Sequence, residues 1–106
     1  MVREIANTND YNASVGSGKA VVDFYAVWCG PCVAIKDYFA QLAAQNPDIT
    51  FVKVNVDTPA NRGAMMAAQV KCMPTFAFYN NGKLVDRLEG ADRNQLASKV
   101  ASLKSK

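Results

Sequence analysis

The sequence predicts an α/β fold: a mixed five-stranded sheet in the order βαβαβαββα, with helices on both faces. Runs of apolar, β-branched and aromatic residues alternate with segments of helical periodicity. The early strands are separated by segments long enough for crossover helices and therefore run parallel. The last two strands flank Asn81-Gly82, the strongest short-range signal for an antiparallel hairpin. The length of 106 residues suits one domain, which we assign to residues 1–106.

The chain begins with a short strand and a helix. Residues 2–5 form a weak strand, and Asn7 with Thr8 can cap a helix that runs to about Val15. The glycine-rich turn at residues 16–18 ends this helix. Residues 20–27 then form an apolar run without a polar face, which predicts a central strand buried on both faces.

A long helix follows the central strand. From Pro31 onward the apolar residues have helical spacing, and the helix is expected to end before Asn46-Pro47. Its apolar face consists of Cys32, Ile35, Phe39, Leu42 and Ala43. Residues 49–56 alternate between apolar and polar side chains, which predicts the next strand.

The third helix is expected to start at Thr58. This residue is a plausible N-cap, and Pro59 suits the first helical position of a helix that runs to about residue 70. Gly63 in its interior lowers helix stability by up to about 1 kcal/mol relative to alanine.

The C-terminal part predicts a hairpin and a helix. Residues 75–80 and 83–89 are the two strands around Asn81-Gly82. Asp92 then caps a final helix. The apolar stripe of this helix consists of Leu96, Val100 and Leu103.

Composition excludes several classes of protein. The net charge is +3 and the basic residues are scattered, whereas nucleic-acid binders usually concentrate them, so we expect no nucleic-acid partner. The longest apolar stretch, residues 20–28, contains Asp23 and is too short to span a bilayer, so we expect no membrane association. The chain has no histidine, which excludes Ser-His and Cys-His hydrolases and imidazole metal sites.

The cysteines favour redox chemistry in a reducing compartment. Cys29, Cys32 and Cys72 are too few for a disulfide-stapled secreted scaffold, and residues 1–5 lack the pattern of a signal peptide. Two cysteines three positions apart then indicate catalysis or a metal. Structural zinc normally needs four cysteine or histidine ligands, so we expect no metal.

The segment Trp28-Cys29-Gly30-Pro31-Cys32 carries the functional signal, at the carboxyl end of the predicted central strand. Cys32 falls on the buried helical stripe, whereas Cys29 precedes the first turn, where its sulfur can face solvent. Unpaired N–H groups and the positive end of the helix dipole lower the pKa of Cys29 and make it the nucleophile. Cys32, one turn away, can attack a mixed disulfide at Cys29. Gly30 permits the turn, and Pro31 fixes φ at the helix start.

Three further residues are candidates, each with a structural alternative. Asp23 lies within an apolar run, so desolvation should raise its pKa and suit it to accept a proton from Cys32; the alternative is an ordinary strand carboxylate. Trp28 should shield the site and offer contact surface rather than pack in the core. Cys72 is either a buried small hydrophobe or an exposed thiol beside the site. An exposed Cys72 could link two copies of the chain through a disulfide.

The whole chain resembles the thioredoxin family. The resemblance rests on the Trp-Cys-Gly-Pro-Cys segment, an aspartate in the preceding strand, Met73-Pro74-Thr75 before the hairpin, and Gly82 and Gly90 beyond it. Residues 71–76 resemble the cytosolic eukaryotic members more closely than the bacterial ones. The resemblance implies a cytoplasmic monomer that reduces protein disulfides through a redox-active Cys29–Cys32 disulfide without a bound cofactor. It also implies an NADPH-dependent thioredoxin reductase as the partner that restores the dithiol.

The resemblance also implies site residues. It implies a cis Met73-Pro74 bond opposite the cysteines, a Met73 backbone that pairs with a substrate strand, and Lys53 near Asp23. The implied substrate-binding residues are Trp28, Gly30, Pro31, Met73, Pro74, Gly90 and Ala91.

The sequence departs from the family at Asp37, where a helix-kinking proline is usual, and at Val33-Ala34, which replace a Lys-Met pair. Two alternative functions are a disulfide oxidase or isomerase domain of the secretory pathway and a non-catalytic binding module. The missing signal peptide and Pro31, where secretory domains commonly carry histidine, argue against the first.

Overall fold

The computed structural model describes residues 1–106 and confirms the α/β class and the order of the elements. The strands are β1 (Val2–Glu4), β2 (Lys19–Tyr25), β3 (Thr50–Asn55), β4 (Thr75–Asn80) and β5 (Lys83–Glu89). The helices are α1 (Thr8–Val15), α2 (Gly30–Gln45), α3 (Arg62–Ala67) and α4 (Arg93–Lys104), with a 3₁₀ turn at Pro59–Asn61. Every helix falls short of the length and apolarity needed to cross a bilayer.

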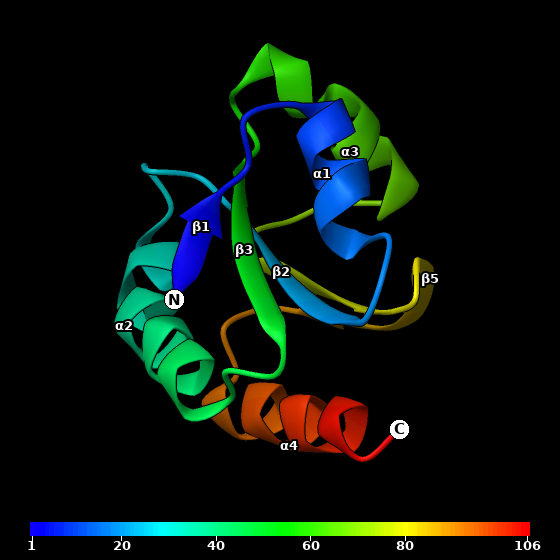
Figure 1. Cartoon of the computed structure of the whole chain (residues 1–106). Coiled ribbons are helices and arrows are strands. Elements are labelled where there is room, and N and C mark those ends of the chain that lie inside the picture. Colours follow the sequence, from blue (N-terminus) through cyan, green and yellow to red (C-terminus); the bar gives the residue numbers. More distant parts are fainter.

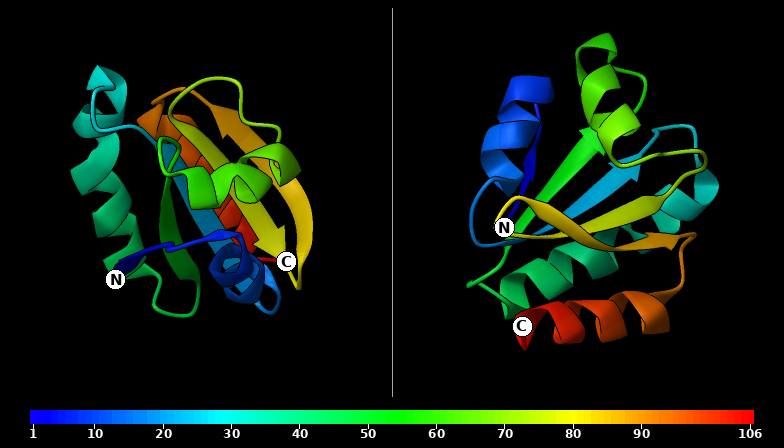
Figure 2. Two further views of the ribbon diagram at one scale, coloured as in Figure 1. Left: turned by 90° about the horizontal axis from the view of Figure 1, so that it is seen from above. Right: turned by 90° about the vertical axis from the view of Figure 1, so that its right-hand side faces the viewer.

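One five-stranded sheet in the order β1-β3-β2-β4-β5 forms the middle layer (Figure 1). The pairs β1–β3 and β3–β2 are parallel and the pair β4–β5 is antiparallel, as predicted. The strand β4 is also antiparallel to β2. Figure 2 shows α2 and α4 together on one face of the sheet, with α1 and α3 on the other. The central strand β2 therefore points its carboxyl end at the start of α2.

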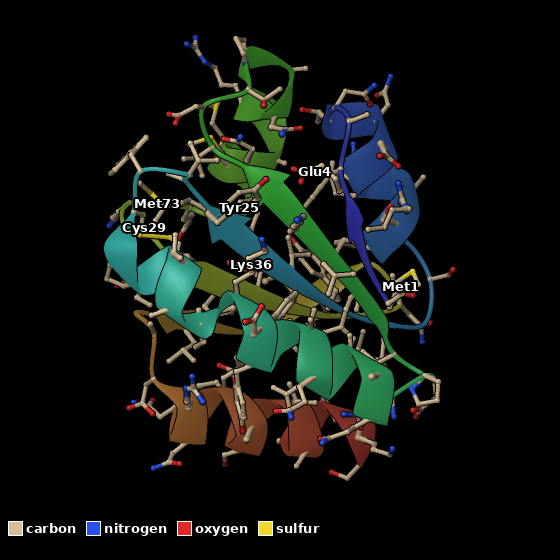
Figure 3. The ribbon with its side chains drawn as sticks, turned by 90° about the vertical axis from the view of Figure 1, so that its left-hand side faces the viewer. Met1, Glu4, Tyr25, Cys29, Lys36 and Met73 are labelled. Carbon is tan, nitrogen blue, oxygen red and sulfur yellow. A yellow bond between two sulfur atoms is a disulfide. The ribbon has the colours of Figure 1, made fainter.

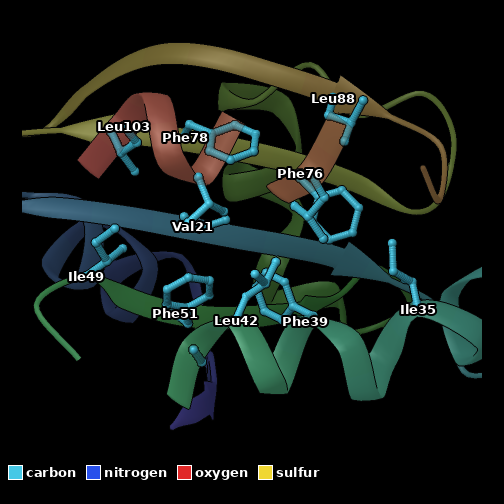
Figure 4. Close-up of a cluster of buried hydrophobic side chains, with 13 residues drawn as sticks. Val21, Ile35, Phe39, Leu42, Ile49, Phe51, Phe76, Phe78, Leu88 and Leu103 are labelled. Atoms are coloured by element: carbon cyan, nitrogen blue, oxygen red, sulfur yellow. The ribbon is translucent and has the colours of Figure 1, made fainter. Parts of the chain in front are cut away.

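Apolar side chains fill both sides of the sheet. Val21 belongs to the core under α2 and α4, which Figure 4 shows, while Val22 and Phe24 belong to the core under α1 and α3. This alternation confirms that β2 is buried on both faces. Phe39 of α2 packs against Phe51, with ring centroids 5.3 Å apart, and so fixes the helix against the sheet.

Local signals set the start of two helices. Asn7 Oδ1 accepts a hydrogen bond from Asp10 N at 2.8 Å, and Asp92 Oδ1 accepts one from Gln95 N at 3.0 Å, so both predicted N-caps are confirmed. The helix α2 runs without interruption from Gly30 to Gln45 although Asp37 replaces the usual proline.

The prediction of one helix from Pro59 to about residue 70 was wrong. A 3₁₀ turn comes first, α3 ends at Ala67, and the Thr58 side chain makes no capping hydrogen bond. The buried Asn61 explains the break, because its Nδ2 donates to Asn55 O at 3.1 Å and its backbone N donates to Thr58 O at 3.0 Å. These tertiary and i−3 bonds replace the regular helical start.

Gly63 has a packing role that propensity alone does not reveal. A Cβ atom at this position would lie 2.8 Å from Thr8 Cγ2 of α1, closer than real contacts allow. Thr8 is itself held by a hydrogen bond from its Oγ1 to Ala60 O at 2.9 Å. The glycine therefore lets α1 and α3 approach each other closely.

Candidate active site

Cys29 and Cys32 lie at the junction between the carboxyl end of β2 and the start of α2. They form a disulfide, visible in Figure 3, with their Cα atoms 5.3 Å apart. Cys29 is the N-cap residue of α2, and its Sγ accepts a hydrogen bond from Cys32 N at 3.2 Å. In the reduced protein this N–H and the positive end of the helix dipole would stabilise a thiolate at Cys29.

The predicted exposure of the two sulfurs requires a correction. Cys32 is covered as expected, with 3% of the residue exposed, but Cys29 is also buried, with 7% exposed. The cause is a tertiary contact: the Cys29 sulfur lies 3.7 Å from the Met73 carbonyl oxygen, and Met73 packs against the small buried cluster that contains the two cysteines. In the disulfide form, Met73 in the segment before β4 thus contributes to the burial of Cys29.

Asp23 is buried in β2, with 5% of the residue exposed, and its Oδ1 has no hydrogen-bond partner. Burial raises its pKa from 3.8 to about 7; the Lys53 ammonium partly opposes this shift and the Glu4 carboxylate adds to it. Asp23 and Cys32 line the same pocket, which has a volume of about 380 Å³. The predicted burial is confirmed, and it raises the pKa as expected, so a buried carboxyl with a raised pKa shares a pocket with the second cysteine.

Trp28 is a surface residue beside the disulfide, with 66% of the residue exposed. Its indole Nε1 donates to Asp57 Oδ2 at 2.7 Å, which anchors the ring while leaving it accessible. Val27, which precedes Trp28, and Val33, which follows Cys32, are exposed as well, although they are apolar. The site is therefore bordered by an apolar surface, and the core alternative for Trp28 was wrong.

Two further loops belong to the site: one precedes β4 and the other follows β5. The Met73-Pro74 bond is cis, and Pro74 is buried. Gly90 N donates to Pro74 O at 2.9 Å, and Gly90 has a φ of +98°, which favours glycine. Ala91 is exposed directly after it. The backbone around Met73 thus faces Cys29, while Gly90 holds the neighbouring loop in place.

Cys72 is a free, exposed cysteine, so of the two alternatives the exposed thiol is confirmed and the buried small hydrophobe is wrong. Its Sγ lies 4.0 Å from Thr75 Oγ1, and it directly precedes Met73. The accessible thiol thus belongs to the residue before Met73, whose carbonyl oxygen lies 3.7 Å from Cys29 Sγ.

The sequence analysis did not predict a role for two polar residues near Asp23, namely Glu4 and Tyr25. Tyr25 Oη donates to Glu4 Oε1 at 2.8 Å, and Lys53 Nζ forms an ion pair with Glu4 at 3.7 Å. The only available signal was the alternation that places Asp23 and Tyr25 on one face of β2; the contacts depend on the strand order.

The sheet has five strands, and the helix that follows its central strand begins at two cysteines that are three positions apart. This arrangement defines a thiol–disulfide oxidoreductase. A family model described as "Thioredoxin" matches residues 2–102. Thioredoxin of Gallus gallus is 40% identical over 106 residues, which cover 97% of this chain and 99% of that protein. Thioredoxin of Equus caballus is 37% identical with the same coverage. The X-ray structure of Fasciola hepatica thioredoxin has a TM-score of 0.86 at 38% identity and covers 95% of this chain and 98% of that one.

The chain therefore belongs to the thioredoxin family. It is a thiol–disulfide oxidoreductase that reduces protein disulfides through reversible oxidation of Cys29 and Cys32.

Proposed function

We propose that Cys29 is the nucleophile and Cys32 the resolving thiol. The Cys29 thiolate attacks one sulfur of a substrate disulfide, and the other substrate sulfur leaves as a thiolate with the bonding electron pair. Cys32 then loses its proton and attacks Cys29 Sγ, which breaks the mixed disulfide and releases the second substrate thiolate. The substrate has gained two electrons, two protons complete its thiols, and the protein ends with the Cys29–Cys32 disulfide.

The hydrogen bond from Cys32 N to Cys29 Sγ at 3.2 Å is the observation that carries this assignment. It places the Cys29 sulfur, and not that of Cys32, at the N-cap of α2. A charge-assisted bond of this kind favours the thiolate of Cys29. Cys32 points into the pocket that also contains Asp23, where an attacking thiolate requires removal of a proton.

We assign Asp23 as the acceptor of that proton. A carboxyl whose pKa is raised to about 7 by burial is ionised in a substantial fraction of molecules at neutral pH. It can therefore take a proton from Cys32 and return it to solvent. The shared pocket of about 380 Å³ leaves room for a water molecule between them.

The substrate segment is proposed to lie in extended form across the disulfide. Its backbone would pair with Met73, whose carbonyl oxygen is 3.7 Å from Cys29 Sγ. The exposed apolar surface of Trp28 supports contact with it. The remaining contact residues are proposed to be Gly30, Pro31, Pro74, Gly90 and Ala91.

We further propose that an NADPH-dependent thioredoxin reductase restores the dithiol of this protein in the cytoplasm. The resemblance of residues 71–76 to cytosolic eukaryotic members supports this assignment. The working form is proposed to be a single-domain monomer without a bound cofactor, since the electrons reside on the two sulfurs. Oxidation of the exposed Cys72 would join two copies through their active-site surfaces.

Trapping of the mixed disulfide tests the assignment of the two cysteines. Cys32→Ser should accumulate stable mixed disulfides at Cys29, because the resolving thiol is absent, and Cys29→Ser should neither reduce nor trap substrates. Peptide mapping by mass spectrometry after incubation with a disulfide-containing protein identifies the linked cysteine. Cys72→Ser in both backgrounds removes the competing thiol. Trapping at Cys32 in Cys29→Ser, with none at Cys29 in the reciprocal variant, would reverse the roles.

A further inference from the structure

A row of charged side chains crosses three strands next to the active site. Glu4 of β1 is in register with Lys53 of β3, and Lys53 is in register with Asp23 of β2. Side chains in register project from the same face of a sheet, and two residues earlier Phe51 and Val21 belong to the core under α2. The row therefore lies on the α2 side, with the ammonium between two carboxyl groups.

The ammonium is paired with the outer carboxylate. Lys53 Nζ forms its ion pair with Glu4 Oε1 at 3.7 Å and forms none with Asp23. It also lies over the aromatic ring of Tyr25, 5.6 Å from the ring centroid. Asp23 Oδ1 has no hydrogen-bond partner, although the strand register places a lysine beside it. Of the two carboxyl groups on either side of Lys53 in the row, only that of Glu4 forms an ion pair with its ammonium.

Tyr25 fixes the carboxylate of Glu4. Its Oη lies 2.8 Å from Glu4 Oε1 and 3.0 Å from Oε2, so one hydroxyl spans both oxygens. Burial and the hydrogen bond to Glu4 raise the pKa of Tyr25, which therefore stays a protonated donor at neutral pH. In Figure 3, Glu4 and Tyr25 lie on the same side of the molecule as Lys36 of α2.

The groups that face Asp23 come from four elements. Glu4 comes from β1, Tyr25 from β2 and Lys53 from β3, and α2 contributes Lys36 together with the Cys29–Cys32 disulfide. Lys36 lines the pocket without an ion-pair partner. Lys53 is the cation whose position the Glu4–Tyr25 pair controls, because it is the only one of the two lysines bound by that pair.

We propose that Glu4 and Tyr25 are positioning residues for disulfide exchange: they hold the Lys53 ammonium away from Asp23 and so leave the Asp23 carboxyl available to exchange a proton with Cys32. The catalytic part of this inference rests on the proposed role of Asp23. An ammonium moved to within 4–6 Å of a carboxylate stabilises the ionised form and makes it a weaker base. The Glu4–Tyr25 pair thus preserves the basicity that the second step of the reaction requires.

The position of Lys53 is tested by the titration of Asp23 in the oxidised protein, in which neither Cys29 nor Cys32 titrates. Carbon-13 NMR of labelled aspartate carboxyls, with Asp23 assigned by its absence from Asp23→Asn, gives the midpoint directly. Glu4→Gln should lower this midpoint by about 1 pH unit or more, because Lys53 is released toward Asp23. Glu4→Gln keeps the size and polarity of the side chain, and its fold is checked by the same spectra.

A double-mutant cycle separates this effect from the direct loss of the Glu4 charge. In the Lys53→Gln background, Glu4→Gln should lower the midpoint by less than half as much. Equal shifts in the two backgrounds, or no shift in either, would overturn the proposal. Tyr25→Phe retains the ring and should lower the midpoint in the same direction by a smaller amount; an unchanged midpoint would remove Tyr25 from the assignment.

The pH dependence of substrate reduction provides the second readout. The midpoint of the rate profile in Glu4→Gln should move by the same amount as the Asp23 titration. If the titration moves and the rate profile does not, Asp23 is not the proton acceptor, and the catalytic part of the inference fails with it. If the titration itself does not move, only the positioning by Glu4 is wrong. A structural role alone would lower stability without moving either midpoint.

Discussion

Replacement of Asp23 by asparagine should stabilise the folded protein at and above neutral pH and slow disulfide exchange. The carboxyl is buried in an apolar strand, and its Oδ1 is unpartnered. An ionised group in this environment costs free energy that a neutral amide of the same size avoids in large part. The same change removes the proposed proton acceptor of Cys32, so stability and exchange rate should change in opposite directions.

The magnitude follows from the raised pKa of Asp23. A pKa of about 7 in the folded state, against 3.8 for the free carboxyl, corresponds to about 4 kcal/mol of lost stability above pH 7, at about 1.36 kcal/mol per pH unit. Between these two pKa values the folded state binds more protons than the unfolded state, so the Asp23 contribution to stability falls as pH rises and levels off above about 7. The asparagine variant lacks this dependence.

Urea unfolding of both proteins at about pH 5 and about pH 8 measures the effect. The advantage of Asp23→Asn should be up to about 4 kcal/mol at the higher pH and smaller by about 2.5 kcal/mol at the lower one. Other titrating groups are common to both proteins and cancel in the difference. Equal stability at both pH values, or a wild-type advantage that grows with pH, would show that Asp23 is paired or solvated and would refute the burial argument.

Two other substitutions test separate features of the structure. After peroxide treatment, wild type should form a covalent dimer on non-reducing electrophoresis and Cys72→Ser should not, because Cys72 is the exposed free thiol; a dimer that persists in Cys72→Ser, or none in wild type, would contradict its assignment. Gly63→Ala should lower the free energy of unfolding by about 1 kcal/mol or more despite the helix propensity of alanine, since its Cβ would lie 2.8 Å from Thr8 Cγ2. The loss should shrink in the Thr8→Ala background, and a stabilised Gly63→Ala would show that α1 and α3 can separate without cost.

The elements that were predicted correctly depend on local interactions. The hairpin strands have the predicted bounds because Asn81 and Gly82 adopt positive φ values of 53° and 84°, which suit the turn between them. Asp92 caps α4 through an N–H three residues away. The third helix failed because Asn61 is fixed by a hydrogen bond to Asn55, a contact between neighbouring segments that helical periodicity does not report.

The same distinction between local and distant contacts separates the site residues that were predicted from those that were missed. Cys29, Cys32 and Asp23 could be predicted because their spacing and their apolar neighbours are local features of the sequence. The burial of Cys29 was missed because Met73, 44 residues away, covers it. Glu4 was missed because its contact with Tyr25 requires β1 to add to β3, and the strand order is not encoded in either segment alone.

Reduction of insulin disulfides, with dithiothreitol as electron donor, tests the central claim most directly. Wild type and Cys72→Ser should both accelerate the precipitation of the free insulin chain, because the Cys29–Cys32 dithiol is intact in each. Cys29→Ser and Cys32→Ser should show no acceleration above dithiothreitol alone. Acceleration that survives either of these two substitutions, or its absence in wild type, would contradict the account of this protein as a reductase that works through the Cys29–Cys32 pair.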